Sequence, residues 1–476
     1  MAAYLQSLEQ LSALLAAQRK ATDAQGRVGA EVRRARIQSV IDLLVDEHEA
    51  LATAMEADFG GRHPGFSLMN DVLGALGSLK HARDHLAEWL PDQPRAAFAP
   101  YDQLGGEAWV QYQPKGTVGI IGTWNAPLFT LLSPLAGAFA AGNRAVLKPS
   151  EITPRTAEVL ARAIDARFDP LELAVINGGV EVGQGFADQP FNHLVFTGST
   201  AVGRDIMRRA AANLVPVTLE LGGKSPVVIG RSADIGETAR RLAIAKGTNG
   251  GQICISPDLV YVPVEQREAF IEAFCASYAA LYPMVQGNGD LTAVVNQRHL
   301  ERVEGCLEEA REMGVQIVRC PDVATPAEER RRPLSIVVNP PKLSRIMQEE
   351  IFGPALVLLS YSEVAHVVEE INQGERPLAL YYFGHDSAEQ QWVLDHTLSG
   401  GVTINDALMH AAMEDAPFGG VGASGMGHYH GREGFAEFSH ARTVFKAPAY
   451  DPRGEWGMLA PYHPGFIDVM KSQITR

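Results

Sequence analysis

Short apolar runs that alternate with helical patterns restrict the fold of this sequence more than any other feature. Strands that are hydrophobic on both faces and are joined by helices form parallel sheets covered by those helices. The sequence therefore predicts an α/β fold. The first strand candidates are Val118–Ile121, Ala145–Leu147, Ala174–Ile176 and Leu194–Phe196, and the helix candidates between them are Leu131–Ala141, Arg155–Ala166 and Gly203–Ala212.

A second set of such elements begins at Val227 and predicts a second α/β domain. A chain of 476 residues is long enough for two or three domain cores. The N-terminal region of the chain, up to about Leu90, has apolar residues at helical spacing. The elements of the second set are Val227–Ile229, Leu259–Val262, Glu301–Met313, Ala355–Leu359 and Leu378–Phe383.

Charge and composition exclude several classes of partner. The net charge of -15 provides no basic field for a phosphate backbone, so we expect no nucleic acid. The uncharged run between Lys115 and Arg144 is interrupted by glycine and proline, which favours buried elements over a membrane span, and the N-terminus lacks the pattern of a secretory signal. The four cysteines are widely spaced, so we expect reduced thiols in a cytoplasmic protein and no metal site.

Three motifs suggest chemistry that their surroundings do not support. Gly420–Gly425 satisfies G-x-G-x-x-G, but it lacks the flanking strand and helix and is interpreted as a loop. Gly222–Ser225 resembles the end of a phosphate loop, yet Thr218 stands where the first glycine is required. His428 and His430 have no third metal ligand at a suitable spacing.

Cys254 and Glu220 are the first candidates for chemistry. Cys254 follows paired glycines and Gln252, which allow close approach of the backbone and add polarity, although composition alone favours a buried structural thiol. Glu220 ends an apolar run, where a carboxylate is costly unless it is paired or functional. It is a candidate base, and a salt-bridged glutamate at a strand end is an equal alternative.

Three further segments each follow a strand candidate and carry polar groups. Asn125 could donate to an oxyanion or simply occupy a turn. Lys148 and Glu151 could bind a ribose or form a surface ion pair. Thr197–Thr200 could bind a pyrophosphate at a helix start or serve only as a helix cap.

Taken together and in this order, these segments resemble the NAD(P)-dependent aldehyde dehydrogenase superfamily. The resemblance extends from about Leu43 to Lys446. Within the superfamily, Cys254–Asp258 and Gly425–Gly431 resemble the class 3 type, and with Asn143-Arg144 and Thr403–Asp406 they are most similar to the coniferyl aldehyde dehydrogenase branch. The motifs that carry the resemblance are GTWNAP, KPSE, FTGST, ELGGKSP, GQIC, EEIFGP and PFGGVGASGMG.

The resemblance implies an aldehyde dehydrogenase-like fold with two parallel-sheet α/β domains and a small β bridging or oligomerisation element. A variant Rossmann cofactor domain without the usual glycine fingerprint would comprise residues 1–98, 115–222 and 405–420. The catalytic domain would comprise 223–404. The bridging element and C-terminal tail would comprise 99–114 and 421–476, with a hairpin around Tyr101–Pro114 that supports a homodimer.

The resemblance also implies roles for individual residues. Cys254 would be the nucleophile and Glu220 the base, and the Asn125 amide with the backbone N–H of Cys254 would hold the oxyanion. Ala126 stands where the family usually has an aromatic residue, so we expect a wide mouth for a bulky aryl or long aldehyde. The implied cofactor-binding residues are Thr123, Trp124, Lys148, Ser150, Glu151, Thr197, Gly198, Ser199, Glu350 and Phe352, and the implied substrate-binding residues are Ala126, Phe129, Ile253 and Ile255.

The implied activity is oxidation of an aldehyde to its carboxylic acid through a cysteine thiohemiacetal and thioester, with a bulky aromatic substrate such as coniferyl aldehyde. Glu151 should accept a ribose 2′-hydroxyl and repel a 2′-phosphate, which favours NAD, although related enzymes with this glutamate also accept NADP. Medium-chain, long-chain or other aromatic aldehydes are alternative substrates. A CoA-acylating dehydrogenase would typically lack Glu220, and a non-enzymatic binding protein would not need all the reactive residues. Esterase activity would be a side reaction.

Overall fold

The computed structural model describes residues 2–99, 101–326 and 328–476. The chain divides into two compact units. The first contains the residues up to Trp89 together with Pro114–Ser439, and the second contains Leu90–Gln113 and His440–Arg476. Both predicted α/β sheets lie in the first unit.

The first sheet has the strand order β1-β6-β5-β4-β7-β8-β16. Its central strands are buried on both faces, as the continuous apolar runs predict. All pairs are parallel except that of β16 with β8, so the carboxyl ends of β4, β5, β7 and β8 lie at one edge. The bounds are β1 Tyr4–Leu5, β4 Thr117–Ile121, β5 Arg144–Lys148, β6 Leu173–Ile176, β7 His193–Gly198, β8 Val217–Leu221 and β16 Gly425–Met426.

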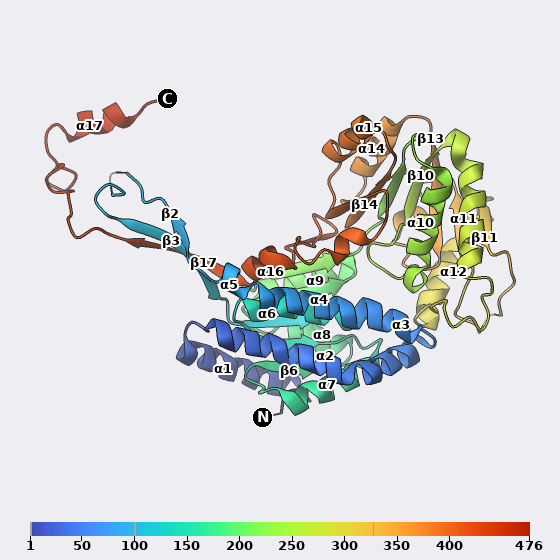
Figure 1. Cartoon of the computed structure of the whole chain (residues 1–476), viewed down its shortest axis with the longest axis horizontal. Coiled ribbons are helices and arrows are strands. Elements are labelled where there is room, and N and C mark those ends of the chain that lie inside the picture. Colours follow the sequence, from blue (N-terminus) through green and yellow to red (C-terminus); the bar gives the residue numbers. More distant parts are fainter. Residues whose placement is uncertain (1, 100, 327) are drawn as a thin grey trace. The chain divides into compact units, whose positions relative to one another are not determined.

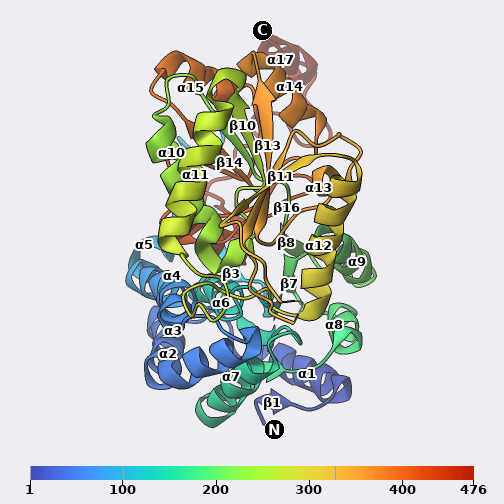
Figure 2. The same cartoon turned by 90° about the vertical axis from the view of Figure 1, so that its right-hand side faces the viewer.

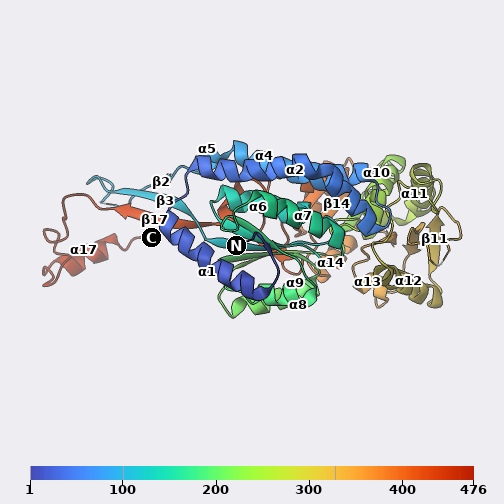
Figure 3. The same cartoon turned by 90° about the horizontal axis from the view of Figure 1, so that it is seen from below.

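Helices cover both faces of this sheet. In Figure 3, α6 (Phe129–Ala140) and α7 (Pro154–Arg167) lie on one face with α2 (Ala30–Phe59) outside them, and α8 (Val180–Ala187) and α9 (Thr200–Ala211) lie on the other. Phe186 of α8 and Ile206 of α9 belong to one apolar cluster with strand residues such as Leu194. The other helices of this part are α1 Leu8–Gln25, α3 Pro64–Ser67, the π-helix η1 Leu68–Leu73, α4 Gly74–Asp84, α5 Leu86–Trp89 and α16 Gly431–Glu437.

The second sheet has the strand order β11-β12-β13-β10-β9-β14-β15 and is parallel except for β11. In Figure 2, α10 (Ile235–Gly247) and α11 (Arg267–Leu281) lie on one side of it and α12 (Gln297–Glu312) lies on the other. The bounds of the strands are β9 Pro226–Ile229, β10 Leu259–Pro263, β11 Gln316–Cys320, β12 Leu334–Val338, β13 Ala355–Tyr361, β14 Ala379–Phe383 and β15 Gly401–Ile404. The remaining helices are η2 Thr248–Gly251, η3 Val264–Gln266, α13 Arg345–Gln348, α14 Val364–Gln373, α15 Ser387–Asp395 and η4 Met409–Ala412.

The second unit contains a three-stranded sheet of order β17-β3-β2, visible in Figure 1. β2 (Gln93–Arg95) and β3 (Glu107–Pro114) are antiparallel, with Gln93 opposite Val110. β17 (Ser439–Lys446) flanks β3, and α17 (Phe466–Gln473) has no buried side chain. The hairpin around Tyr101–Pro114 therefore extends back to Gln93.

Two segments fall outside the domain boundaries expected from the sequence. Residues 90–98 belong to the second unit, and residues 421–439 belong to the first. The second difference has a clear cause, because β16 pairs with β8 and α16 packs against α6. Among the described residues, no helix is long and apolar enough to cross a membrane.

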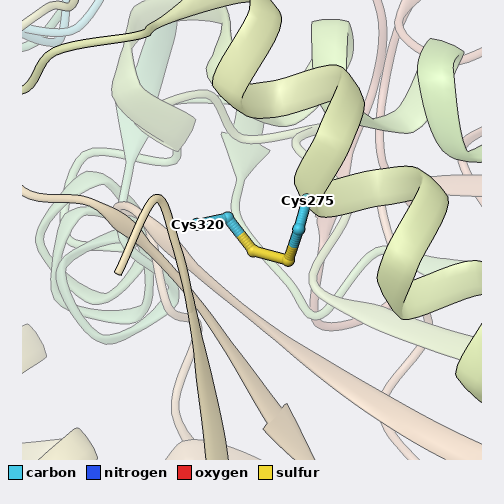
Figure 4. Close-up of a disulfide and its surroundings, with 2 residues drawn as sticks. All are labelled: Cys275 and Cys320. Carbon is cyan, nitrogen blue, oxygen red and sulfur yellow. A yellow bond between two sulfur atoms is a disulfide. The ribbon is translucent and has the colours of Figure 1, made fainter. Parts of the chain in front are cut away.

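The expectation that all four cysteines are reduced thiols is wrong for this structure. Cys275 of α11 and Cys320 at the end of β11 form a disulfide, drawn in Figure 4. They are 45 residues apart in the chain, and the fold brings their Cα atoms to 5.0 Å. Cys254 and Cys306 are free, with Cys254 half-buried and Cys306 buried.

Candidate active site

The polar residues singled out in the first sheet lie together at its carboxyl edge. Asn125 follows β4, Lys148 ends β5, and Thr197 and Glu220 are paired neighbours on β7 and β8. Ile121 at the end of β4 is in register with both Lys148 and Phe196. This edge of an open parallel sheet is the usual position for ligands.

Cys254 lies in a loop whose backbone requires glycine. After α10 the chain forms η2, in which Asn249 and the two following glycines have positive φ. A Cβ atom on Gly251 would lie only 2.3 Å from the carbonyl oxygen of Gly353. Only glycine fits this close approach, which accounts for the paired glycines ahead of the thiol.

Gln252 holds this loop in place rather than facing the thiol. Its Nε2 donates to the carbonyl oxygens of Asn249 (2.9 Å) and Ala293 (3.1 Å), and its Oε1 accepts from the backbone N–H of Val295 (2.9 Å). The side chain is completely buried and its donors and acceptor are satisfied. The polarity next to Cys254 in the sequence is therefore a structural requirement of the loop.

Hydrogen bonds tie Asn125 directly to the Cys254 loop. Its Nδ2 donates to the carbonyl oxygen of Gln252 (3.1 Å), and its own carbonyl accepts from Asn249 Nδ2 (3.2 Å) and Arg62 (3.2 Å). An amide nitrogen carries two protons, so one N–H of Asn125 remains for another acceptor. These contacts join the turn after β4 to the loop before β10.

A buried ion pair supports the same turn. Arg62 donates to Asp71, and both side chains are fully buried. The other oxygen of Asp71 accepts from the backbone N–H of Leu128 (3.0 Å) at the start of α6. Because Arg62 also donates to Asn125, the pair fixes the position of the segment between Asn125 and α6.

Replacement of Asp71 by alanine should lower the free energy of unfolding by about 3–5 kcal/mol, since it leaves the Arg62 charge buried and unpaired. Denaturant titration of both proteins measures this loss. The control is Asp84→Ala, which breaks the surface pair with Arg83 and should cost about 0–1 kcal/mol. Equal stability losses in the two variants would contradict the account.

The thiol of Cys254 is protonated in the resting site. Its pKa is raised to about 12, mainly by burial and also by the negative charges of Glu350 and Glu220, while the backbone N–H groups of Cys254 and Ile255 oppose the shift. The residue is nonetheless half-buried and therefore reachable. Attack by this sulfur requires a base that removes its proton.

Glu220 has the properties of such a base. It is 3% exposed, and neither carboxylate oxygen has a hydrogen-bond partner among the described residues. Burial raises its pKa well above the usual value, and the charge of Glu437 adds to the shift. Its charge acts on the Cys254 thiol. An unpaired buried carboxylate is costly for stability and is typical of a functional group.

Two further buried charges flank the site. The carboxylate of Glu350 lies so close to Gly222 that a Cβ atom there would be 2.1 Å from Oε2, and burial raises its pKa to about 8. Lys246 of α10 is 1% exposed, and burial lowers its pKa to about 8. Sequence reasoning missed Lys246, because only the fold shows that this helix position is buried.

The residues expected to hold a dinucleotide offer suitable groups. Lys148 pairs with Glu151 (3.0 Å), and Ser150 Oγ accepts from the N–H of Ile152 (3.2 Å). Thr197 has a buried hydroxyl without a partner in the described part of the chain, and it lies next to Gly198 and to Ser199, which caps α9. An unsatisfied hydroxyl beside a helix N-terminus fits a phosphate-bearing ligand.

An aromatic cluster stands beside these groups. Trp124 and Phe352 meet edge to face at 5.3 Å and belong to one buried cluster with Phe59. Phe352 has a positive φ of 43°, a conformation rare for a bulky residue. Thr123 is fixed by a hydrogen bond from its N–H to Thr130 Oγ1 (3.1 Å).

The expected substrate residues have different exposures. Ala126 and Ile255 are buried, and Ile253 and Phe129 are half-buried. The carbonyl of Ile255 accepts from the hydroxyl of Tyr381 (2.5 Å). Phe129 packs over Gly74 and meets His430 edge to face at 5.9 Å. The neighbours Tyr429, His430 and Glu414 had no role in the sequence prediction.

Comparison with known proteins identifies the class of this site. The model of the aldehyde dehydrogenase family matches residues 2–444, nearly the whole chain. The chain belongs to the aldehyde dehydrogenase family. This aldehyde dehydrogenase is 44% identical to a probable coniferyl aldehyde dehydrogenase of Caulobacter vibrioides, an alignment that covers 97% of the chain and 96% of the relative. It is also 44% identical to the coniferyl aldehyde dehydrogenase of a Pseudomonas species, with coverage of 98% and 97%.

Solved structures confirm the fold. AldH of Staphylococcus aureus, determined in a substrate-bound state, superposes with a TM-score of 0.91 at 32% identity and covers 99% of this chain and 100% of its own. An aldehyde dehydrogenase of Mycobacterium tuberculosis complexed with NAD+ gives a TM-score of 0.84 at 27% identity, with coverage of 94% and 92%. This aldehyde dehydrogenase is therefore an oxidoreductase that acts on small-molecule aldehydes with a nicotinamide cofactor.

Proposed function

We propose that this aldehyde dehydrogenase oxidises bulky aryl aldehydes of the coniferyl aldehyde type to carboxylic acids, with NAD as the preferred cofactor. The observation that carries the proposal is a buried, unpartnered Glu220 carboxylate whose charge acts on the Cys254 thiol. A water-activating base at this position favours release of the free acid over transfer to CoA. The coniferyl aldehyde dehydrogenases at 44% identity support the aryl substrate.

The first half of the reaction forms a bond between Cys254 and the aldehyde carbon. Glu220 removes the thiol proton, because the raised pKa of its carboxyl makes it a stronger base than an ordinary glutamate. The sulfur adds to the carbonyl carbon, and the new oxyanion accepts from the free N–H of Asn125 and the backbone N–H of Cys254. A nicotinamide cofactor held by the residues assigned below would supply the hydride acceptor that converts this thiohemiacetal into a thioester.

The second half hydrolyses the resulting thioester. After Glu220 has released the thiol proton to solvent, its carboxylate takes a proton from water and the resulting hydroxide attacks the acyl carbon. The carbon–sulfur bond breaks, the acid leaves, and the Cys254 thiolate regains a proton. Burial of Glu220, which is 3% exposed, keeps its carboxylate more basic than that of an ordinary glutamate. The same chemistry supports esterase activity as a side reaction.

We assign the cofactor to the edge of the first sheet. Lys148, Ser150 and Glu151 would bind the adenine ribose, and Thr197, Gly198 and Ser199 the pyrophosphate. Glu350 would bind the nicotinamide ribose, and Phe352, Trp124 and Thr123 would shape the cleft. The partly exposed carboxylate of Glu151 supports NAD over NADP, because its negative charge would repel the 2′-phosphate of NADP.

Activity should depend on pH through Glu220. Glu220 must be ionised to act as a base. We therefore expect kcat to rise as the pH increases through the raised pKa of Glu220 and to be low at pH values below that pKa. Glu220→Gln should remove this rise and lower kcat by roughly 10²–10⁴-fold. Steady-state rates of acid formation across pH measure both effects.

The matched variant is Glu437→Gln. The charge of Glu437 is the second cause of the raised pKa of Glu220, so its removal should move the rise of kcat to lower pH without abolishing turnover. Full activity of Glu220→Gln, or acid formation only when CoA is added, would overturn the proposed role.

The small side chain at position 126 should matter only for bulky substrates. Ala126 is buried beside Asn125, so Ala126→Phe should lower kcat/KM for coniferyl aldehyde by roughly 10-fold or more through overpacking. The value for propanal should change little. Unchanged turnover of coniferyl aldehyde by this variant would contradict the assignment of Ala126 to the substrate pocket.

We also propose a role for each of the two large sheets, a homodimeric assembly and a location for the protein. The first sheet would carry the cofactor and the second sheet the catalytic cysteine. The three-stranded sheet formed by β2, β3 and β17 would contribute to a homodimer, which light scattering at defined concentrations tests. The proposed location is the cytoplasm, which subcellular fractionation tests.

A further inference from the structure

His430 is a buried polar residue that the mechanism above does not use. It is 5% exposed, and neither ring nitrogen has a hydrogen-bond partner among the described residues. Its ring is surrounded by those of Phe129, Phe418 and Tyr429 at 4.9 to 5.9 Å. Buried polar groups without partners are rare and call for an explanation.

The charge state of His430 defines what it can bind. Its pKa is lowered to about 4, mainly by burial and also by the charge of His81, while the backbone of Met413 opposes the shift. The ring is therefore neutral at physiological pH. A neutral imidazole presents one N–H donor and one acceptor nitrogen, which suits an uncharged polar group.

A second unsatisfied group lies in the adjacent segment. Oε2 of Glu414 is buried and has no hydrogen-bond partner within the ranges that the structure describes, and the carboxylate lies against Gly77 of α4. Burial raises the pKa of Glu414, while a hydrogen bond from Ser78 opposes the shift. A Cβ atom on Gly431 would lie 3.3 Å from the carbonyl oxygen of Glu414, so the His430 and Glu414 segments touch.

Tyr429 links this pair to the catalytic residues. Its side chain is buried, and burial is the largest cause of the raised pKa of its hydroxyl. The charges of Glu220, Cys254 and Glu414 also raise this pKa. The Tyr429 hydroxyl is therefore within electrostatic range of the two catalytic residues and of Glu414. Phe129, assigned to the substrate above, contacts His430. These interactions connect the unsatisfied groups with the substrate residue Phe129 and, through Tyr429, with the catalytic residues.

We propose that His430 and Glu414 bind a hydroxyl group at the end of the substrate opposite its aldehyde, as in a 4-hydroxyaryl aldehyde. The substrate O–H donates to Oε2 of Glu414, and its oxygen accepts the ring N–H of His430. The inference rests on the proposed aryl aldehyde function and adds the residues that select among such aldehydes. A substrate without the hydroxyl would leave both groups buried and unpaired, which is the strongest basis for rejecting an analogue.

The test compares 4-hydroxycinnamaldehyde with cinnamaldehyde, which lacks only the hydroxyl. The wild-type enzyme should favour the hydroxylated aldehyde by roughly 10-fold or more in kcat/KM. Equal values for the two aldehydes would overturn the inference while leaving aryl aldehyde oxidation intact. Failure to oxidise either aldehyde would instead overturn the proposed function.

Two variants locate the preference. His430→Asn keeps a side chain that tolerates the positive φ of 76° at this position but shortens it, and Glu414→Met keeps its length without the acceptor. Each variant should bring the ratio of kcat/KM for 4-hydroxycinnamaldehyde to kcat/KM for cinnamaldehyde towards 1. The change should come chiefly from a lower kcat/KM for 4-hydroxycinnamaldehyde, and the value for cinnamaldehyde should change by less than about 3-fold. The control His428→Phe, two residues from His430, should retain the wild-type preference. Retention of the preference by both test variants contradicts the assignment.

Discussion

The burial of Glu220 and the Cys254 loop is the condition on which the chemistry of this aldehyde dehydrogenase depends. In water, a carboxylate is too weak a base to deprotonate a thiol or a water molecule efficiently. Burial without partners raises the pKa of Glu220, and the same burial keeps Cys254 protonated until that base acts. The burial that makes an ionised Glu220 carboxylate costly for the stability of the fold thus also makes it a reactive base.

The reacting groups must also be held in position, and hydrogen bonds between loops that adjoin the two sheets provide this. Gln252 fixes the Cys254 loop through backbone partners, and Asn125 donates to the carbonyl of Gln252. The buried Arg62–Asp71 pair then anchors Asn125 to α6. In our proposal, this network sets the position of the oxyanion donors relative to the sulfur.

The sequence predicted those parts of the molecule that local patterns determine. β4, β5, β6 and β7 were foreseen because each contains a continuous run of apolar residues, and the polar residues at their carboxyl ends were foreseen because parallel strands end at one edge. Contacts between distant residues had no local signal. The disulfide of Cys275 with Cys320, the burial of Lys246 and the pairing of β16 with β8 all depend on the tertiary fold. The unsatisfied atoms of His430 and Glu414 were equally invisible, because burial rather than residue type makes them unusual.

The covalent intermediate tests the central claim most directly. Rapid acid quenching of the enzyme during turnover of an aryl aldehyde with NAD, followed by peptide mass spectrometry, shows where the acyl group is attached. The account predicts a mass increase by that acyl group on the peptide containing Cys254, and loss of both the adduct and steady-state oxidation in Cys254→Ser. Oxidation at the wild-type rate by Cys254→Ser, or an acyl group attached to a different residue, would contradict it.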